Sequence, residues 1–264
     1  MNIEILYYYL LLGSVAGLVA GLLGVGGGLI IVPALIVLLT MQGMEHAHIV
    51  HMAIGTSLAT IVITSISSTW AHHRHGAVQW PVFARLSPGI VIGALIGAAI
   101  ADYMSASLLR NVFAVFVLIV AVQMLSGVRP SGHREVPENT GMFSAGGIIG
   151  AVSSVVGIGG GTMTVPFLLW CNVKIREAVA TSAACGLPIA IAGASGYIIT
   201  GWDESSMPEW SSGYIYWPAF IGIVLMSILF APLGAYLAHR LPVLYLKRAF
   251  ALVLFAIGIR MLST

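Results

Sequence analysis

Charged side chains are scarce in this chain. Asp, Glu, Lys and Arg make up 8% of its 264 residues, whereas soluble domains carry about 25%, so the composition excludes a soluble protein. Hydrophobic residues make up 59%, and several apolar runs reach the roughly 20 residues that cross a bilayer as a helix. The net charge of +2 is too small to suggest a nucleic-acid partner. We therefore expect a multi-pass membrane protein surrounded by lipid.

Signatures of catalysis and of cofactor binding are also missing. The two cysteines, Cys171 and Cys185, lie apart in apolar segments without ligand spacing, which indicates small core side chains. The intramembrane segments hold no paired carboxylates, no HExxH and no credible Ser-His-Asp set. The sequence thus predicts no enzyme, no cofactor and no metal centre. The N-terminal run lacks a basic start and a cleavage site, so it is interpreted as a retained first helix.

Two glycine-rich stretches interrupt the apolar runs. Gly24-Val25-Gly26-Gly27-Gly28 is followed by Val32-Pro33, and Gly157-Ile158-Gly159-Gly160-Gly161 is followed by Val165-Pro166. Each glycine costs a helix interior roughly 1 kcal/mol against alanine. In lipid such an opened backbone is tolerated only where it faces protein or a polar cavity. Neither stretch has the Lys-Ser/Thr of a nucleotide-binding loop, so we interpret both as breaks between membrane helices.

The two breaks belong to a tandem repeat of about 130 residues. Gly24 aligns with Gly157, Thr56-Ser57 with Thr181-Ser182, and Trp80 with Trp217, all in the same order. We therefore divide the chain into repeats 1–127 and 141–264, joined by a polar linker at 128–140. The helical segments that we expect are 3–23, 28–41, 49–71, 80–101 and 106–126 in the first repeat, and 141–157, 161–172, 177–199, 214–238 and 242–262 in the second.

The basic residues indicate how these segments cross the membrane. If each glycine break were a kink, Lys and Arg would divide almost evenly between the two faces. If each break is a reversal, most of them fall on one face and most acidic residues on the other, as the positive-inside rule requires. The odd number of segments then gives the repeats opposite orientations. We expect an all-α membrane protein of two inverted repeats with short, Gly/Pro-broken helices and with both termini outside the cytoplasm.

Rows of small residues four apart predict close helix packing. Gly13, Gly17 and Gly21 form one row, and Gly89, Gly93 and Gly97 form another. Such rows let helix backbones approach closely in lipid. Packing within the bundle is the simpler interpretation, and a homodimer is the alternative.

Each glycine break leads into a short helix whose first N–H groups have no partner in the helix itself. Free N–H groups and the positive end of the helix dipole attract small anions, whereas the simpler alternative is that the glycines only permit tight turns. The candidate substrate-binding residues at the breaks are Gly26, Gly27, Gly28, Gly159, Gly160, Gly161 and Thr162.

Hydroxyl groups follow each break in the sequence. Thr56-Ser57 and Thr181-Ser182 are further candidates, because a hydroxyl near a helix start can donate to an oxyanion. Arg176 precedes the second pair and His51 the first, and a nearby cation would concentrate anions. Hydrogen bonding of each hydroxyl to its own helix is the alternative. Weaker candidates of the same kind are Ser153, Ser154, Thr162 and Thr164.

Two other groups of basic side chains have two readings each. Arg85 lies about a turn inside a predicted span, where it is either a pathway residue or a side chain that reaches the lipid headgroups. His46 and His48 precede the third segment and His51 lies near its start, while His72-His73-Arg74-His75 follow its end. Histidine clusters can bind metals or sense pH, but these two fall at opposite faces, so loop residues at the interface are the simpler reading.

Taken together, the doubled Gly-x-Gly-Gly-Gly-x-x-x-Val-Pro, each copy followed by Ala-x-x-Thr-Ser, resembles the TauE/SafE family of membrane permeases, or sulfite exporters. The resemblance covers nearly the whole chain. It implies secondary transport of small sulfur-containing anions such as sulfite, sulfoacetate or other organosulfonates, often outward across the bacterial inner membrane. The family pattern falls on Gly26–Gly28, Gly159–Gly161, Thr56-Ser57 and Thr181-Ser182. Departures are Ala180, where the first copy has Gly55, and His51, where the second copy has Arg176.

The prediction is therefore a secondary transporter that binds its anion between the two breaks and works by alternating access. The scarcity of intramembrane carboxylates leaves proton coupling or uniport open. One alternative is a metal-cation permease that uses the histidine clusters. Another is a membrane assembly factor that transports nothing.

Overall fold

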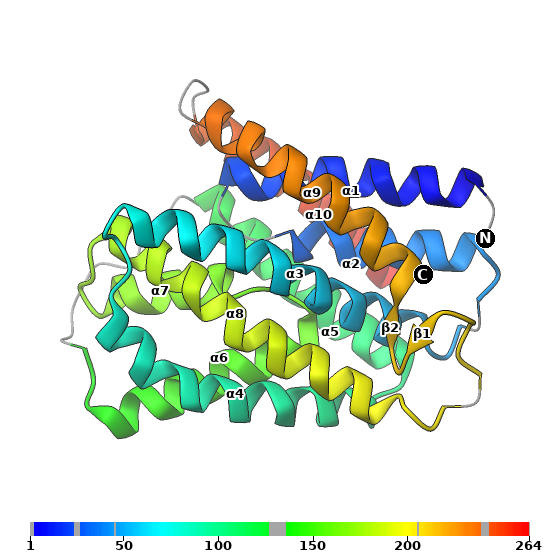
Figure 1. Cartoon of the computed structure of the whole chain (residues 1–264), viewed down its shortest axis with the longest axis horizontal. Helices are drawn as coiled ribbons and strands as arrows, with labels where there is room; N and C mark the ends of the chain where they lie inside the picture. The colour runs from blue at the N-terminus through cyan, green and yellow to red at the C-terminus, as the bar shows by residue number, and fades with distance from the viewer. Residues whose placement is uncertain are drawn as a thin grey trace.

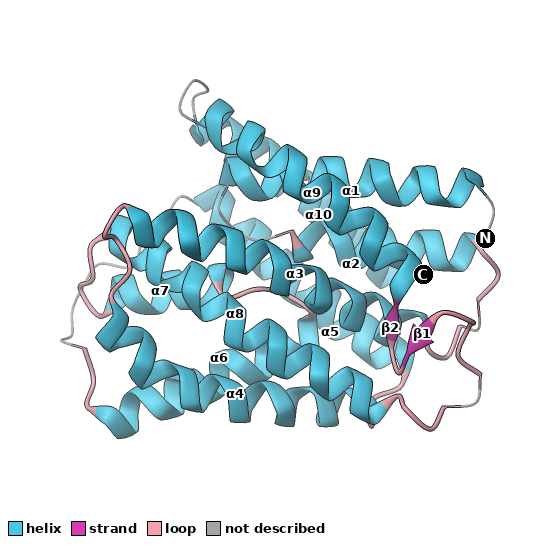
Figure 2. Ribbon diagram, in the orientation of Figure 1, coloured by secondary structure: helices cyan, strands magenta, loops and turns pink. Residues whose placement is uncertain are grey.

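The computed structural model describes residues 3–23, 27–44, 46–126, 136–204, 206–238 and 243–263. This part of the chain forms ten α-helices and a two-stranded antiparallel ribbon (Figures 1 and 2). The elements are α1 (Ile3–Leu23), α2 (Gly28–Met41), α3 (Ile49–Arg74), α4 (Trp80–Asp102), α5 (Ala106–Ser126), α6 (Asn139–Val156), α7 (Gly161–Trp170), α8 (Ile175–Thr200), β1 (Ser211–Ser212), β2 (Ile215–Tyr216), α9 (Trp217–Ala238) and α10 (Val243–Ser263).

The prediction of an all-α membrane protein is confirmed. Seven of the described helices are long and apolar enough to cross a bilayer. The helices that follow the breaks, α2 and α7, have only 14 and 10 residues. α10 is as long as α5 but includes Lys247, Arg248 and Arg260, which lower its hydropathy. Cys171 and Cys185 are both free and buried, as expected of small core side chains.

One predicted boundary is wrong. The segment expected as a helix from residue 214 begins instead with a hairpin, in which Ser212 pairs with Ile215 and Ser211 with Tyr216. Gly213 turns this hairpin at a φ of 54°, a left-handed conformation that side chains disfavour. α9 therefore starts at Trp217. Much of the linker predicted at 128–140 lies outside the described residues, and α6 begins at Asn139.

The first glycine break reverses the chain. A Cβ at Gly27, just before α2, would lie 3.6 Å from Cβ of Ala16, in the middle of α1. Near the other end of both helices, the Gln42 amide donates a hydrogen bond to the Tyr9 hydroxyl. α2 therefore runs back along α1, antiparallel to it, rather than continuing it after a kink.

Two long helices, α3 and α8, run antiparallel through the centre of the bundle (Figure 1). Thr69 donates to the Ala183 carbonyl near one end of the pair, and Gly55 packs on Tyr197 near the other. α3 and α8 are the most buried of the spans. Their central position makes them the frame against which both glycine breaks are placed.

The first helix of each half packs on a helix of the other half. α1 packs on α9, and its counterpart α6 packs on α4. A Cβ at Gly13 would lie 2.4 Å from the carbonyl oxygen of Ile223. In the repeat, Gly146 corresponds to Gly13 and Leu86 to Ile223, and a Cβ at Gly146 would likewise lie 2.4 Å from the carbonyl oxygen of Leu86. Small residues at these positions let the backbones touch. The predicted rows of small residues are therefore used inside this chain.

Candidate substrate site at the glycine breaks

The two glycine breaks meet in the interior. A Cβ at Gly28 would lie 2.5 Å from the carbonyl oxygen of Gly157 and 3.1 Å from Cα of Ile158. Gly157 itself has a φ of 73° and packs on Ile54 and Val32. Only glycine satisfies both the left-handed conformation and the close contact there. The sequence placed the breaks in corresponding positions, and the fold brings them into contact.

The short helices point away from this contact in opposite directions. Short connections make α2 antiparallel to α3 and α7 antiparallel to α8, and α3 is antiparallel to α8. α2 therefore runs toward one end of the bundle and α7 toward the other (Figure 1). Their N-terminal ends, which carry the positive partial charge of each helix dipole, face the same central region.

Several backbone N–H groups at these ends have no partner among the residues that the structure describes. Ile30 and Ile31 both donate to the Gly27 carbonyl, and Thr164 donates to the Gly160 carbonyl. Within the described residues, no hydrogen bond engages the N–H groups of residues 27–29 or 159–163. Of the predicted donors, those from Gly159 to Thr162 have no partner among the described residues, whereas the residues just before Gly27, from which acceptors for the N–H groups of Gly28 and Leu29 would come, lie outside the described part of the chain. Gly26, which was predicted with them, lies outside the described residues.

Unpaired hydroxyl groups gather around the second break. Ser153, Ser154, Thr164 and Ser182 are each at most 2% exposed, and their hydroxyls make no hydrogen bond to any other described residue. The hydroxyl of Thr162, a partly exposed residue, also makes no hydrogen bond to any other described residue. An unsatisfied buried polar group costs about 1–3 kcal/mol. Among these residues, the Thr164 hydroxyl and the backbone of Ser182 lie against Gly160 at the start of α7.

Thr56 and Thr181 have structural partners instead. Thr56 Oγ1 accepts a hydrogen bond of 3.0 Å from the backbone N–H of Tyr216, and Thr181 Oγ1 accepts one of 2.9 Å from that of Gln79. Tyr216 and Gln79 are the residues just before α9 and α4. The aligned threonines Thr56 and Thr181 thus hold the starts of α9 and α4. Neither of these two hydrogen bonds is the bond to the threonine's own helix that the sequence left open as the alternative.

Ser57 connects the two halves directly. Its hydroxyl donates a hydrogen bond of 2.9 Å to the carbonyl of Gly157, the first residue of the second break. Central α3 is thereby fixed to the point where the breaks meet. The predicted pair Thr56-Ser57 therefore lies beside the breaks, with both hydroxyls engaged by protein in this conformation.

The two predicted arginines lie away from the breaks. Arg85 is exposed and lines a cavity of about 360 Å³ with Glu138, Asn139 and Thr140, between the starts of α4 and α6. Arg176 is also exposed, in the first turn of α8. For Arg85, this position favours an interfacial side chain over a pathway residue.

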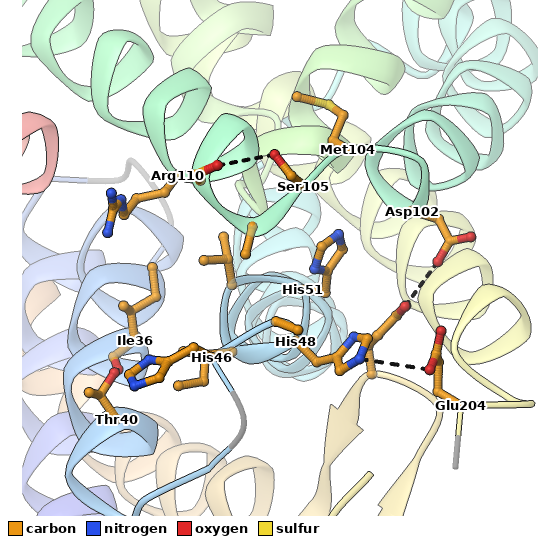
Figure 3. A pocket seen from close by; sticks show the side chains of 16 residues that line it. Ile36, Thr40, His46, His48, His51, Asp102, Met104, Ser105, Arg110 and Glu204 are labelled. Carbon is orange, nitrogen blue, oxygen red and sulfur yellow. Dashed lines mark hydrogen bonds and ion pairs between the residues drawn. The ribbon is translucent and has the colours of Figure 1, made fainter. Parts of the chain in front are cut away.

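A larger cavity of about 660 Å³ opens at the end of the bundle where α2 ends and α3 begins (Figure 3). Tyr214 of the hairpin stacks on His48 and His51, with ring centroids 5.9 and 5.1 Å apart. Its hydroxyl donates to Asp102 Oδ1 at 3.0 Å. Burial, and then the bond to Asp102, raise the pKa of Tyr214, so it stays a neutral donor. Glu204 lies 3.7 Å from His48.

The histidines therefore separate as the sequence predicted, with one exception. His46, His48 and His51 line the larger cavity, while His73 contacts Trp80 at the opposite end of α3. Across the described part of the chain, no group of three or more His, Cys, Asp or Glu is arranged to hold a metal ion. The exception is His51, which was expected at an interfacial loop but is buried in α3 at 3% exposure.

Sequence reasoning missed the hairpin that completes this cavity. The run Ser211-Ser-Gly-Tyr-Ile-Tyr216 has a Ser-Gly turn signal followed by three residues of high β-propensity, which is a hairpin signal. The apolar run that follows concealed it. Tyr214, Ile215 and Tyr216 are all buried, so the hairpin is part of the core and not a surface loop.

Comparison with known proteins shows the family of the chain. The family model of the sulfite exporter TauE/SafE matches residues 9–261. The chain belongs to the TauE/SafE family. TauE/SafE membership confirms the resemblance seen in the doubled glycine motif, and with the seven apolar spans it indicates a multi-pass membrane transporter.

Relatives of the chain carry the same general description. A probable membrane transporter protein of Haemophilus influenzae is 39% identical over 253 residues, 96% of each chain. The probable membrane transporter protein YunE of Bacillus subtilis is 26% identical over 271 residues, 95% of each chain. A probable membrane transporter protein of Methanocaldococcus jannaschii is 25% identical over 263 residues, 96% of this chain and 94% of its own length. No solved structure matches the chain significantly.

Proposed function

We propose that this TauE/SafE protein is a secondary transporter that exports a small sulfur-containing anion, such as sulfite, sulfoacetate or a related organosulfonate, across the bacterial inner membrane. The anion binds where the two glycine breaks meet. The observation that carries this proposal is the pair of helix N-termini, α2 and α7, that face one central region lined by unpaired buried hydroxyls.

The charge of this region suits a small anion. Each helix N-terminus carries roughly half an elementary charge, so two of them supply about one positive charge. Within the described residues, the buried polar side chains are serines, threonines and one histidine. Hydroxyls and N–H groups donate to oxyanion oxygens without placing a permanent charge in the membrane. A sulfite-like or sulfonate group has the oxygens to accept from both helix ends.

Alternating access follows from treating residues 1–127 and 141–264 as inverted repeats around this site, with both termini outside the cytoplasm. The exchanged packing of α1 on α9 and α6 on α4, and the opposite directions of α2 and α7, support this arrangement. In such transporters one bundle rocks against the other around a fixed midplane site. The hydrogen bonds Tyr216–Thr56 and Gln79–Thr181 occupy equivalent positions in the two repeats, so each would help to close the site toward one face of the membrane.

The test is to remove a hydroxyl that the fold does not use. Thr164→Val in proteoliposomes keeps the shape of the side chain and removes an unpaired buried group, so stability stays equal or rises slightly. We expect sulfite or sulfonate efflux to fall about tenfold, as the loss of one hydrogen bond to a charged group implies. Thr40→Val is the matched control, because Thr40 is exposed and bonds within its own helix. Unchanged flux in a folded Thr164→Val protein would refute the site.

A further inference from the structure

His51 is an ionisable residue that the anion site does not use. It lies in the first turn of α3 and is 3% exposed. Among the described residues it is the one His, Lys, Arg, Asp or Glu in the buried set. Ionisable side chains within membrane helices are costly, and where they persist they commonly serve ion or proton pathways.

The hydrogen bonds of His51 define where a proton can bind. Nε2 lies 2.9 Å from the carbonyl oxygen of Ala101. A carbonyl only accepts hydrogen bonds, so Nε2 carries the hydrogen and Nδ1 of the neutral ring has a free lone pair. Nδ1 is buried, and it has no hydrogen-bond partner in the part of the chain that the structure describes. The ring is therefore fixed in the tautomer that accepts a proton at Nδ1.

Charged and titratable groups surround His51 from several elements. Tyr214 of the hairpin stacks on its ring, and the Tyr214 hydroxyl bonds Asp102 at the end of α4. His48 lies 6.4 Å away between ring centroids. Glu204 beyond His48, Arg110 on α5 and His46 before α3 complete the ionisable lining of the cavity among the described residues (Figure 3). The cavity of about 660 Å³, which His51 lines, gives water a route to this side chain.

We propose that His51 is the proton-binding site that couples anion transport to a proton, a role that rests on the proposed transport function. His51 and Ser57 are six residues apart on α3, about 9 Å along the helix, and Ser57 bonds Gly157 where the breaks meet. At that distance a positive charge raises the affinity for a monovalent anion about tenfold. The proton comes from cavity water. Because coupling is reciprocal, the bound anion favours the protonated ring in turn.

The experiment uses methanesulfonate, which is ionised throughout the pH range, so that pH acts on the protein alone. Reconstituted wild type is expected to show a KM that falls about tenfold between about pH 8 and about pH 5. Proton movement is followed with a pH-sensitive dye inside the vesicles. In His51→Gln, the amide donates to Ala101 in place of Nε2 but cannot take up a proton. The KM of His51→Gln should stay at the value that wild type has at high pH, at every pH tested. The variant should also move no protons.

Controls separate the possible outcomes. His75→Gln, at the exposed end of α3, is expected to keep the wild-type profile. Tyr214→Phe keeps the stacked ring but frees Asp102, so the midpoint of the pH dependence should move to higher pH. The proposal is overturned if folded His51→Gln still moves protons or keeps its pH-dependent KM, or if Tyr214→Phe leaves the midpoint unchanged. If wild type carries neither methanesulfonate nor sulfite at any pH, the transport function itself is wrong.

Discussion

The two glycine breaks have the same pattern of glycines, but the side chains beside them differ. The second break carries hydroxyls at Ser153, Thr162 and Thr164, all without a partner among the described residues. The aligned residues of the first half are Ala20, Leu29 and Ile31. The first break is therefore apolar and the second is polar. In the proposed anion site, both repeats would supply helix ends, and the second repeat would supply most of the side-chain donors.

The contact between the breaks gives the largest expected effect. Gly28→Ala places a Cβ 2.5 Å from the Gly157 carbonyl oxygen, so the two breaks must move apart. Overpacking of this kind costs about 1–3 kcal/mol, and we expect a value near the top of that range with loss of transport. Thermal unfolding in detergent and flux in proteoliposomes measure the two effects.

The matched substitution is on the other break. Gly159→Ala places its Cβ 3.4 Å from a side-chain carbon of Ile61, which is a nearly ordinary contact. It should change stability little. Equal destabilisation by Gly28→Ala and Gly159→Ala would contradict the claim that Gly28 is the point of contact.

The aligned threonines test whether the repeats remain equivalent elsewhere. Thr56→Val and Thr181→Val each remove the acceptor of a backbone N–H, that of Tyr216 and that of Gln79. Each variant should lose about 1–2 kcal/mol, the cost of leaving a donor unpaired. Cysteine labelling from each side of the membrane should then show opposite changes in accessibility. The same change on the same side for both variants would contradict their equivalence.

The aligned serines should give the smallest effects and the sharpest contrast. Ser57→Ala removes the bond to Gly157 and should cost about 1 kcal/mol. Ser182→Ala removes a hydroxyl that no other described residue engages, so its stability should hardly change while anion affinity falls. Denaturation curves and KM values compare the two. A larger stability loss for Ser182→Ala than for Ser57→Ala would invert the assignment of roles.

Much of the fold follows from local pattern in the sequence. Long apolar runs predicted the spans, and Gly/Pro positions predicted the short α2 and α7, because helix length and helix breaking are local properties. The hairpin at Ser211–Tyr216 was missed because the apolar run after Tyr214 is compatible with both strand and helix. In that stretch, tertiary contacts with α3 decide the structure.

The candidate site was only partly predictable. The repeat identified 24–28 and 157–161 as corresponding breaks, but the contact between Gly28 and Gly157 joins residues far apart in the chain and depends on α3 and α8. The burial of His51 depends on Ala101 and Tyr214, which distant segments bring to it. A single sequence does not specify such contacts. It also gave no sign that Thr56 and Thr181 would hold the starts of α9 and α4.

The exchanged packing of α1 on α9 has a consequence for how the protein is made. α1 leaves the ribosome about 200 residues before α9 does, so the glycine face of α1 at Gly13 and Gly17 waits for its partner during most of translation. α6 is made after its packing partner, since α4 precedes it in the chain. The N-terminal half made alone would keep an unfilled groove on α1, and its assembly would depend on receiving α9 from a separately made C-terminal half. The two halves are interlocked, and the bundle closes only when its last quarter is inserted.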